Sequence, residues 1–239
     1  MVSYTCVRDV MDQILGFTII IILVFGIIQF PNSTTIASNS TNIFPPESKP
    51  YGLSYPEHLQ NYWKWIISIP LDQSPMEDTG ENCSINQTNT NSSVFYLANS
   101  GGGVVTRTCN VPADKALFIP IYPMVLAKAE SPDATDEDLR NDAKADVDRV
   151  LKSSLSLKID NSVYKNLTAY RIISDIFDIY FPENAIFGTA SPGIYKSAAD
   201  GYYIITPPLS KGNHTIEFGS AQSGNQPYSQ HVTYHLTVE

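Results

Sequence analysis

The sequence predicts a mainly β domain, an antiparallel β-sandwich of the immunoglobulin-like or jelly-roll-like kind, with two or so packed α-helices and an N-terminal transmembrane helix. Two observations favour the β class. Short runs rich in Val, Ile, Tyr and Phe recur along the second half of the chain, and turn residues separate them. The last run, residues 231–239, alternates apolar and polar side chains, as a half-buried strand does. A third observation, an uncharged apolar run near the N-terminus, predicts the membrane helix.

The composition is typical of one globular domain preceded by a targeting segment. The chain has 239 residues, and 43% of them are hydrophobic, which is enough to build a core. Its formal net charge is −9. This charge argues against nucleic acid as a partner, because phosphates require a basic surface, and against adhesion to an anionic membrane surface.

The apolar run covers residues 14–30, which as a helix would be roughly 25 Å long, the lower limit for crossing a bilayer. We therefore expect residues 1–30 to be an uncleaved anchor that holds the following domain outside the cell membrane. The alternative is a signal peptide whose cleavage would leave the protein secreted, although the small-residue site at 35–37 lies well past the run. Residues 31–50 are rich in Ser, Thr, Asn and Pro and are predicted to be a disordered linker, and residues 51–239 the exported domain.

Every candidate N-glycosylation site lies on the C-terminal side of the apolar run. Their clustering is expected for a segment exposed to a glycosylating compartment. The alternative is that these residues simply form polar loops. The candidate sites are Asn32, Asn39, Asn82, Asn86, Asn91, Asn166 and Asn213.

Two cysteines, Cys83 and Cys109, also follow the apolar run. An even pair on the exported side favours a disulfide. The bond would close a loop of about 26 residues and stabilise the fold by roughly 3.5 kcal/mol in the chain-entropy model. Two separate buried thiols are the alternative. A zinc site is not expected, because no C-x-x-C accompanies them.

The first helix is predicted after Ser54, with Pro56 in its first turn and Pro70 beyond its end. Its apolar residues follow helical spacing, while Trp65 points to a different side. A second helix is predicted with Thr135 as the N-cap and three acidic residues in its first turn. The apolar stripe of the first helix is Leu59, Tyr62, Trp63, Ile66 and Ile67, and that of the second is Leu139, Ala143, Val147, Val150 and Leu151.

Strands are predicted in the rest of the domain. Residues 93–99 and 104–109 form a predicted hairpin around Gly101–Gly103. Residues 116–126 are apolar, but Pro120 and Pro123 argue against a central, fully paired strand. A tight turn at Asp160–Asn161 joins two further strands. The remaining strand-like runs are residues 176–181, 201–208, 214–220 and 231–239.

The four histidines do not predict a metal site. His231 and His235 share a strand face, but four strand residues span roughly 13 Å, too far for two ligands of one ion. We expect His231 and His235 to be surface histidines on the polar side of an edge strand, and we expect neither a metal nor another cofactor. The four are His58, His214, His231 and His235.

The sequence identifies no catalytic residue. Ser162 and Lys165 match S-x-x-K, but on a predicted strand, and Gly101–Gly103 lacks the lysine of a phosphate loop. The acidic residues 133–142 lack a calcium-loop pattern and are better explained as the start of a helix. If the protein is a hydrolase, its two carboxylates would come from Asp72, Asp78, Asp114 or Asp200.

Several stretches resemble an uncharacterised family of exported bacterial and archaeal proteins. They are YWKWIISIPLDQSPMEDTGENC, SVFYLANSGGGVVTRTCNVPADKALFIPI, ADGYYIITPPLSKGNHTIEFGSA and VTYHLTV. The similar pattern is a Trp-rich helix, Asp-Thr-Gly before the first Cys, a second Cys before Val-Pro, and a terminal Gly-x-His-Thr-Ile hairpin. The resemblance covers about residues 62–238. It implies an exported domain, supports pairing of Cys83 with Cys109, and implies no catalytic residues, since that family has no established activity.

These observations predict a membrane-anchored extracellular domain that binds a glycan or a protein of the envelope. The abundant aromatic residues could stack on sugars, or they could all be core residues. The alternative function is an exported hydrolase that acts on a carbohydrate or a peptide.

Overall fold

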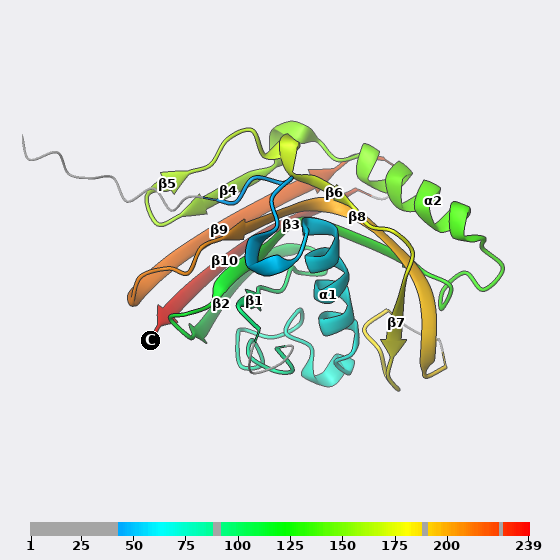
Figure 1. The fold of residues 1–239 in the computed structure, drawn as a ribbon, viewed down its shortest axis with the longest axis horizontal. Coiled ribbons are helices and arrows are strands. Elements are labelled where there is room, and N and C mark those ends of the chain that lie inside the picture. The colour runs from blue at the N-terminus through cyan, green and yellow to red at the C-terminus, as the bar shows by residue number, and fades with distance from the viewer. Residues whose placement is uncertain (1–42, 88–91, 188–190, 225–226) are drawn as a thin grey trace, which may run out of the picture. The chain divides into compact units, whose positions relative to one another are not determined.

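The computed structural model describes residues 43–239, apart from 88–91, 188–190 and 225–226 (Figure 1). This part of the chain is mainly β, with two five-stranded sheets and two α-helices, which confirms the predicted class. The predicted anchor and most of the predicted linker lie outside the described residues. Within the described residues, no helix is both long and apolar enough to cross a membrane.

The first sheet has the strand order β1-β3-β8-β6, and β7 also pairs with β8. Its long strand β8 pairs with β3 along one edge and with β6 and then β7 along the other. The strands are β1 (Val94–Tyr96), β3 (Ala116–Ala127), β6 (Arg171–Ile173), β7 (Phe177–Phe181) and β8 (Gly193–Thr206).

The second sheet has the order β2-β10-β9-β4-β5. The predicted turn at Asp160–Asn161 is confirmed, since β4 and β5 pair antiparallel on either side of it. The last strand is confirmed as well, with its apolar residues buried and His231 and His235 exposed. It is not the predicted edge strand, however, because it pairs with both β2 and β9. The strands are β2 (Gly103–Val111), β4 (Ser156–Ile159), β5 (Ser162–Val163), β9 (Gly212–Gln222) and β10 (Tyr228–Val238).

The predicted hairpin of residues 93–99 and 104–109 is wrong. β1 pairs parallel with β3 in the first sheet, and β2 pairs parallel with β10 in the second. These two pairings also correct the expectation of purely antiparallel sheets. Burial explains why the two strands lie in different sheets: every residue of β1 is buried, whereas β2 has one exposed face and lies at the edge of the second sheet. Gly102 and Gly103, both with positive φ, carry the chain from one sheet to the other.

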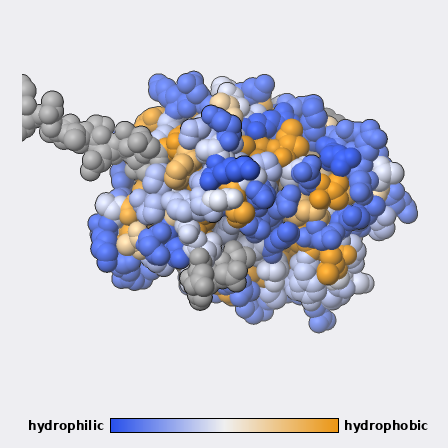
Figure 2. Space-filling view, viewed as in Figure 1, coloured by the Kyte–Doolittle hydropathy of each residue, from blue (hydrophilic) through white to orange (hydrophobic). Residues whose placement is uncertain are grey.

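Two apolar cores separate three layers. The helix-side core lies between α1 (Tyr55–Ile67) and the first sheet, and includes Tyr62, Phe118 and Tyr203. The inter-sheet core lies between the two sheets and includes Phe218 and Tyr234. Figure 1 shows α1 against the first sheet, on the side away from β9 and β10. On the face seen in Figure 2, apolar residues lie in separate patches between hydrophilic ones.

Both helices were predicted close to their observed positions. Ser54 and Glu57 form a capping box at the start of α1, and Thr135 accepts a hydrogen bond from the backbone of Asp138 at the start of α2 (Asp136–Asp148). The predicted stripe of α2 is too long, because Val150 and Leu151 lie beyond the end of the helix. The short 3-10 helices are η1 (Pro50–Gly52), η2 (Leu71–Gln73), η3 (Lys152–Ser154) and η4 (Leu167–Tyr170).

The ordered contacts begin before residue 51. The Phe44 backbone N–H donates to the carbonyl of Ile205 at 2.9 Å, and its carbonyl accepts the Tyr55 hydroxyl at 2.7 Å. Pro50 is buried, and its carbonyl accepts a hydrogen bond from the buried His58 ring. Residues 44–50 therefore pack against the domain along the first sheet and α1.

A bulge in β3 changes which of its residues face each core. The pairing with β8 shifts between Pro120 and Tyr122, so that Ile121 is an extra residue. Ile121 and Tyr122 consequently both face the inter-sheet core. Gly201 lies opposite the bulge, where an added Cβ would come within 2.1 Å of the Tyr122 carbonyl oxygen. Only glycine fits this close approach of the two strands.

Candidate functional site

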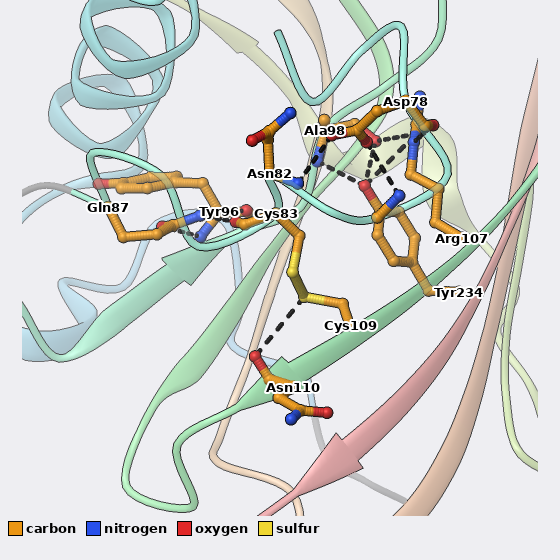
Figure 3. The surroundings of a disulfide bond; sticks show 11 residues. Asp78, Asn82, Cys83, Gln87, Tyr96, Ala98, Arg107, Cys109, Asn110 and Tyr234 are labelled. Atoms are coloured by element: carbon orange, nitrogen blue, oxygen red, sulfur yellow. Dashed lines mark hydrogen bonds between the residues drawn. A yellow bond between two sulfur atoms is a disulfide. The ribbon is translucent and has the colours of Figure 1, made fainter. Parts of the chain in front are cut away.

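The Cys83–Cys109 disulfide is present, as predicted (Figure 3). It joins β2 to residues 74–87, which we call the disulfide loop. Both cysteines are nearly fully buried and belong to the inter-sheet core. The bond therefore attaches an irregular polar segment to the most regular part of the molecule.

The Asp-Thr-Gly sequence before Cys83 shapes this loop. The Asp78 carboxylate accepts hydrogen bonds from the backbone N–H groups of Gly80 and Asn82, at 2.9 and 2.8 Å. The Thr79 carbonyl accepts the N–H of Thr108 on the outer edge of β2. Gly80 lies against Thr108, where a Cβ would be 2.0 Å from the carbonyl oxygen. Each residue of the motif thus has a structural role, and Asp78 is occupied by backbone donors.

The disulfide loop contacts all three layers. Thr79 contacts β2, as described above. The Gln87 side chain donates to and accepts from the backbone of Tyr96 on β1, both at 2.9 Å (Figure 3). The Trp65 indole of α1 donates to the carbonyl of Ile85 at 2.8 Å. This contact explains why Trp65 is buried although it points away from the stripe of its helix.

Arg107 is fully buried, a position that was not predicted for it from the sequence. Its guanidinium donates to the carbonyls of Met76, Asp78 and Ala98, at 2.6, 3.1 and 3.1 Å, and lies 5.6 Å from the ring centre of Tyr234. Alternation along β2 could have indicated the inward direction of Arg107, because it shares a face with Cys109. The arginine ties the disulfide loop to β2 and to the segment after β1.

A cavity of about 500 Å³ lies where α1, the bulged part of β3 and the C-terminal end of α2 meet. We call it the aromatic cavity, because the side chains of Trp63, Tyr122, Phe187 and Tyr228 line it. Trp63 and Phe187 have ring centres 6.0 Å apart, and Tyr122 and Tyr228 have ring centres 5.9 Å apart. The remaining lining includes Met76, Met124 and Leu126, the polar residues Asn99, Ser100 and Gln222, and the charged residues Glu130, Asp146 and Arg149.

The prolines of β3 help to form this cavity. β1 pairs with β3 only at residues 116–118, before Pro120. Past this point the bulge turns Tyr122 and Met124 towards the inter-sheet core, and residues 122–126 line the cavity. Residues 116–127 nevertheless form a central strand that pairs with β8 along nearly its whole length. The expectation that the prolines exclude full pairing is confirmed only on the β1 side, where pairing ends at residue 118.

The two carboxylates of the cavity differ in how many hydrogen bonds and ion pairs they form within the protein. Asp146 accepts the Tyr122 hydroxyl at 2.7 Å, the Gln222 amide at 2.9 Å and the Arg149 guanidinium. The Tyr122 pKa is raised far above its ordinary value by burial and by this carboxylate. Glu130, at the exposed mouth, makes no side-chain hydrogen bond or ion pair with any described residue, and burial raises the pKa of its carboxyl.

The four carboxylates predicted as a source of an acid pair do not line the aromatic cavity. Asp72 is exposed on η2, and Asp114 pairs with its neighbour Lys115. Asp78 is bound within the disulfide loop. Asp200 is buried and held by the Arg171 guanidinium, at 2.6 to 3.2 Å, and burial raises the pKa of its carboxyl.

Ser210, His214 and Asp160 form an arrangement that resembles a catalytic triad. The Ser210 hydroxyl lies 3.4 Å from His214 Nε2, and the Asp160 carboxylate 2.8 Å from His214 Nδ1. However, the Ser210 carbonyl lies closer to Nε2, at 2.8 Å, so this nitrogen donates a proton instead of accepting one from serine. Asp160 also caps the Thr215 N–H at 2.9 Å. We interpret the arrangement as a structural turn at the start of β9.

The remaining site predictions fall in different places. Asn86, Asn166 and Asn213 are exposed, whereas Asn82 is half-buried in the disulfide loop. Asn32, Asn39 and Asn91 lie outside the described residues. Ser162 is on strand β5, as expected, with Lys165 exposed beyond it.

Comparison with family models, with curated proteins and with solved structures returns no significant match. The functional argument therefore depends on the residues of this chain.

Proposed function

We propose that the protein is a membrane-anchored, exported domain that binds a small ligand in the aromatic cavity. The uncharged run at residues 14–30 supports an anchor. The Cys83–Cys109 disulfide supports an oxidising compartment, because such bonds persist outside the cytosol. The exposed sequons at Asn86, Asn166 and Asn213 are accessible for glycosylation in that compartment.

We infer that the two sheets form a β-sandwich to which α1 adds a third layer. The shared inter-sheet core supports this architecture, since side chains from β3 and β8 meet those of β9 and β10 there. The parallel pairs β1–β3 and β2–β10 differ from a purely antiparallel immunoglobulin-like or jelly-roll-like arrangement.

The observation that carries the binding proposal is the lining of the aromatic cavity. Ligand sites are typically concave, are mostly apolar, hold a few polar groups and have volumes of roughly 300 to 1,000 Å³. The aromatic cavity has a volume of about 500 Å³, two aromatic pairs in its lining, and at its mouth a carboxylate that no described residue pairs with. The hydrolase alternative gains no comparable support, because Asp78, Asp146 and Asp200 are held in structural hydrogen bonds.

Ligand binding is tested with the full chain in nanodiscs, using thermal unfolding in the presence of neutral sugars, amines and carboxylates. At least one class should raise the melting temperature. The variant Met124→Trp fills the cavity and should lose this shift, whereas Val163→Trp, at a 65% exposed position on β5, should retain it. A wild-type protein that no probe stabilises would contradict the binding proposal.

The location is tested on whole cells that express the chain. Added protease should digest the domain, and thiol labelling without reductant should leave Cys83 and Cys109 unmodified. Protection from protease together with two free thiols would overturn the exported location.

A further inference from the structure

We propose that the aromatic cavity binds an organic ammonium group, with Glu130 as its counter-ion. This inference rests on the proposed function, because it names the class of ligand for the same cavity. It follows from three properties of the lining, which are its residual charge, its aromatic rings and its small remaining capacity for hydrogen bonds.

The residual charge of the cavity is negative. Asp146 and Arg149 form an ion pair within the lining, so their charges offset each other. Among the charged residues of the lining, only the Glu130 carboxylate then has no opposite charge beside it. The nearest cation in sequence, Lys128, is already paired with Asp136 at 3.3 Å. A ligand that carries one positive charge would neutralise the cavity.

Glu130 lies exposed at the mouth of the aromatic cavity, and its carboxylate is paired with no described residue. Burial raises the pKa of its carboxyl, which means that the carboxylate has lost part of its hydration. No described side chain compensates for this loss with a hydrogen bond or an ion pair. A cation at the mouth would provide the missing interaction, since partly desolvated charges are stabilised by opposite charges at short range.

The aromatic rings favour the same chemistry. The faces of Trp, Tyr and Phe carry negative electrostatic potential and attract ammonium groups within about 6 Å of the ring centre. Phe187 and Tyr228 line the cavity as partly exposed rings, and each packs against a nearly fully buried ring of the lining, Trp63 and Tyr122 respectively. Such linings bind alkylammonium groups, including quaternary ones that cannot donate hydrogen bonds.

A neutral sugar fits the lining less well, because it needs many free hydrogen-bonding groups. Asn99 is bound to the Tyr62 hydroxyl and to the Ser100 carbonyl. That carbonyl also accepts the Tyr228 hydroxyl at 3.0 Å. The carboxylate of Asp146 is likewise occupied. A metal ion fits poorly as well, because the described residues contain no group of three or more His, Cys, Asp or Glu placed to hold one.

The test is isothermal titration of the full chain in nanodiscs of zwitterionic lipid. Phosphate buffer is required, because amine buffers would compete. The probes are choline, its uncharged carbon isostere 3,3-dimethylbutan-1-ol, and putrescine as a primary amine. We expect choline or putrescine to bind at least tenfold more tightly than the isostere, a comparison that needs no variant.

A matched pair of variants identifies the counter-ion. Glu130→Gln should weaken binding of the cationic probe at least tenfold. Asp114→Asn removes the same charge from an exposed position outside the cavity and should leave binding unchanged. Thermal unfolding of both variants shows whether they are folded.

Two failures can be told apart. If the isostere or a sugar binds as tightly as the cation, or Glu130→Gln binds normally, the ammonium inference is wrong while the cavity still binds ligands. If neither cationic nor neutral probes bind, the proposed function fails together with the inference.

Discussion

The helix-side core and the disulfide loop meet at Trp65, and different interactions stabilise each of them. The helix-side core consists of packed rings, in which Phe118 lies 5.4 Å from Tyr62, Tyr96 and Tyr203 between ring centres. The disulfide loop has little apolar surface and depends on one covalent bond and on a buried arginine. The comparison shows that a polar segment can be ordered without a core of its own when its backbone groups are bound.

The largest effect is expected in the helix-side core. Phe118→Ala should lower the free energy of unfolding by about 3 to 5 kcal/mol, because it removes a ring that contacts three others and leaves a cavity. Urea denaturation gives the value, and Phe118→Leu should lose much less. A small loss for the alanine variant would mean that ring packing does not dominate this region.

A slightly smaller effect is expected for the disulfide. The double variant Cys83→Ala, Cys109→Ala should lose about 3.5 kcal/mol, because the unfolded chain regains the freedom of a loop of 26 residues. Hydrogen exchange should rise first in residues 74–87 and only later in α1. Uniform acceleration across both regions would contradict the distinction between them. The wild-type protein with its disulfide reduced is the matched control, because it lacks the bond but keeps both cysteine side chains.

Arg107 should contribute about 2 kcal/mol. Arg107→Met keeps much of the side-chain volume but leaves the carbonyls of Met76, Asp78 and Ala98 without their donor. The free energy of unfolding and the exchange of the Thr108 amide, which bonds to Thr79, measure the loss. Arg107→Lys should recover part of it. Full stability of the methionine variant would show that the loop is held by the disulfide alone.

The smallest effect concerns pH. His58 is buried against Pro50, its Nδ1 has no hydrogen-bond partner among the described residues, and burial lowers its pKa below the ordinary value of 6.5. The unfolded chain therefore binds the proton at higher pH than the folded one, so stability should fall as the pH drops below about 6.5. His58→Gln should show a shallower decline between pH 7 and pH 5 in thermal unfolding. Parallel curves for the two proteins would exclude this contribution.

The sequence predicted best those elements whose start or turn depends on interactions between residues close together in the chain. Thr135 and the acids after it mark the start of α2, and the turn at Asp160–Asn161 marks the β4–β5 hairpin. The disulfide was predicted because an even pair of cysteines follows the apolar run. In contrast, the parallel pairing of β1 with β3 depends on burial of both faces of β1, which periodicity over three residues cannot reveal.

The aromatic cavity could not be predicted for the same reason. Asp146 belongs to an acidic helix and has the pattern of a solvated residue, until tertiary packing places it against Tyr122, 24 positions earlier. Glu130 lies in a loop with no motif around it. Only the prolines of residues 116–126 indicated irregular pairing near the place where the cavity forms, which the structure shows as the bulge opposite β8 and the end of pairing with β1.

The contacts of Thr79 and Gln87 have a consequence for how copies of the protein meet. An open strand edge offers unpaired N–H and C=O groups to which a strand of a neighbouring molecule can add. Thr79 lies on the free edge of β2, and the Gln87 amide imitates a neighbouring strand along β1. The opposite edge strand of the second sheet, β5, has only two residues. At the β1 and β2 edges, the disulfide loop thus occupies backbone groups to which a strand of another copy could add, and reduction of the disulfide should expose these groups when the loop loses its fixed position.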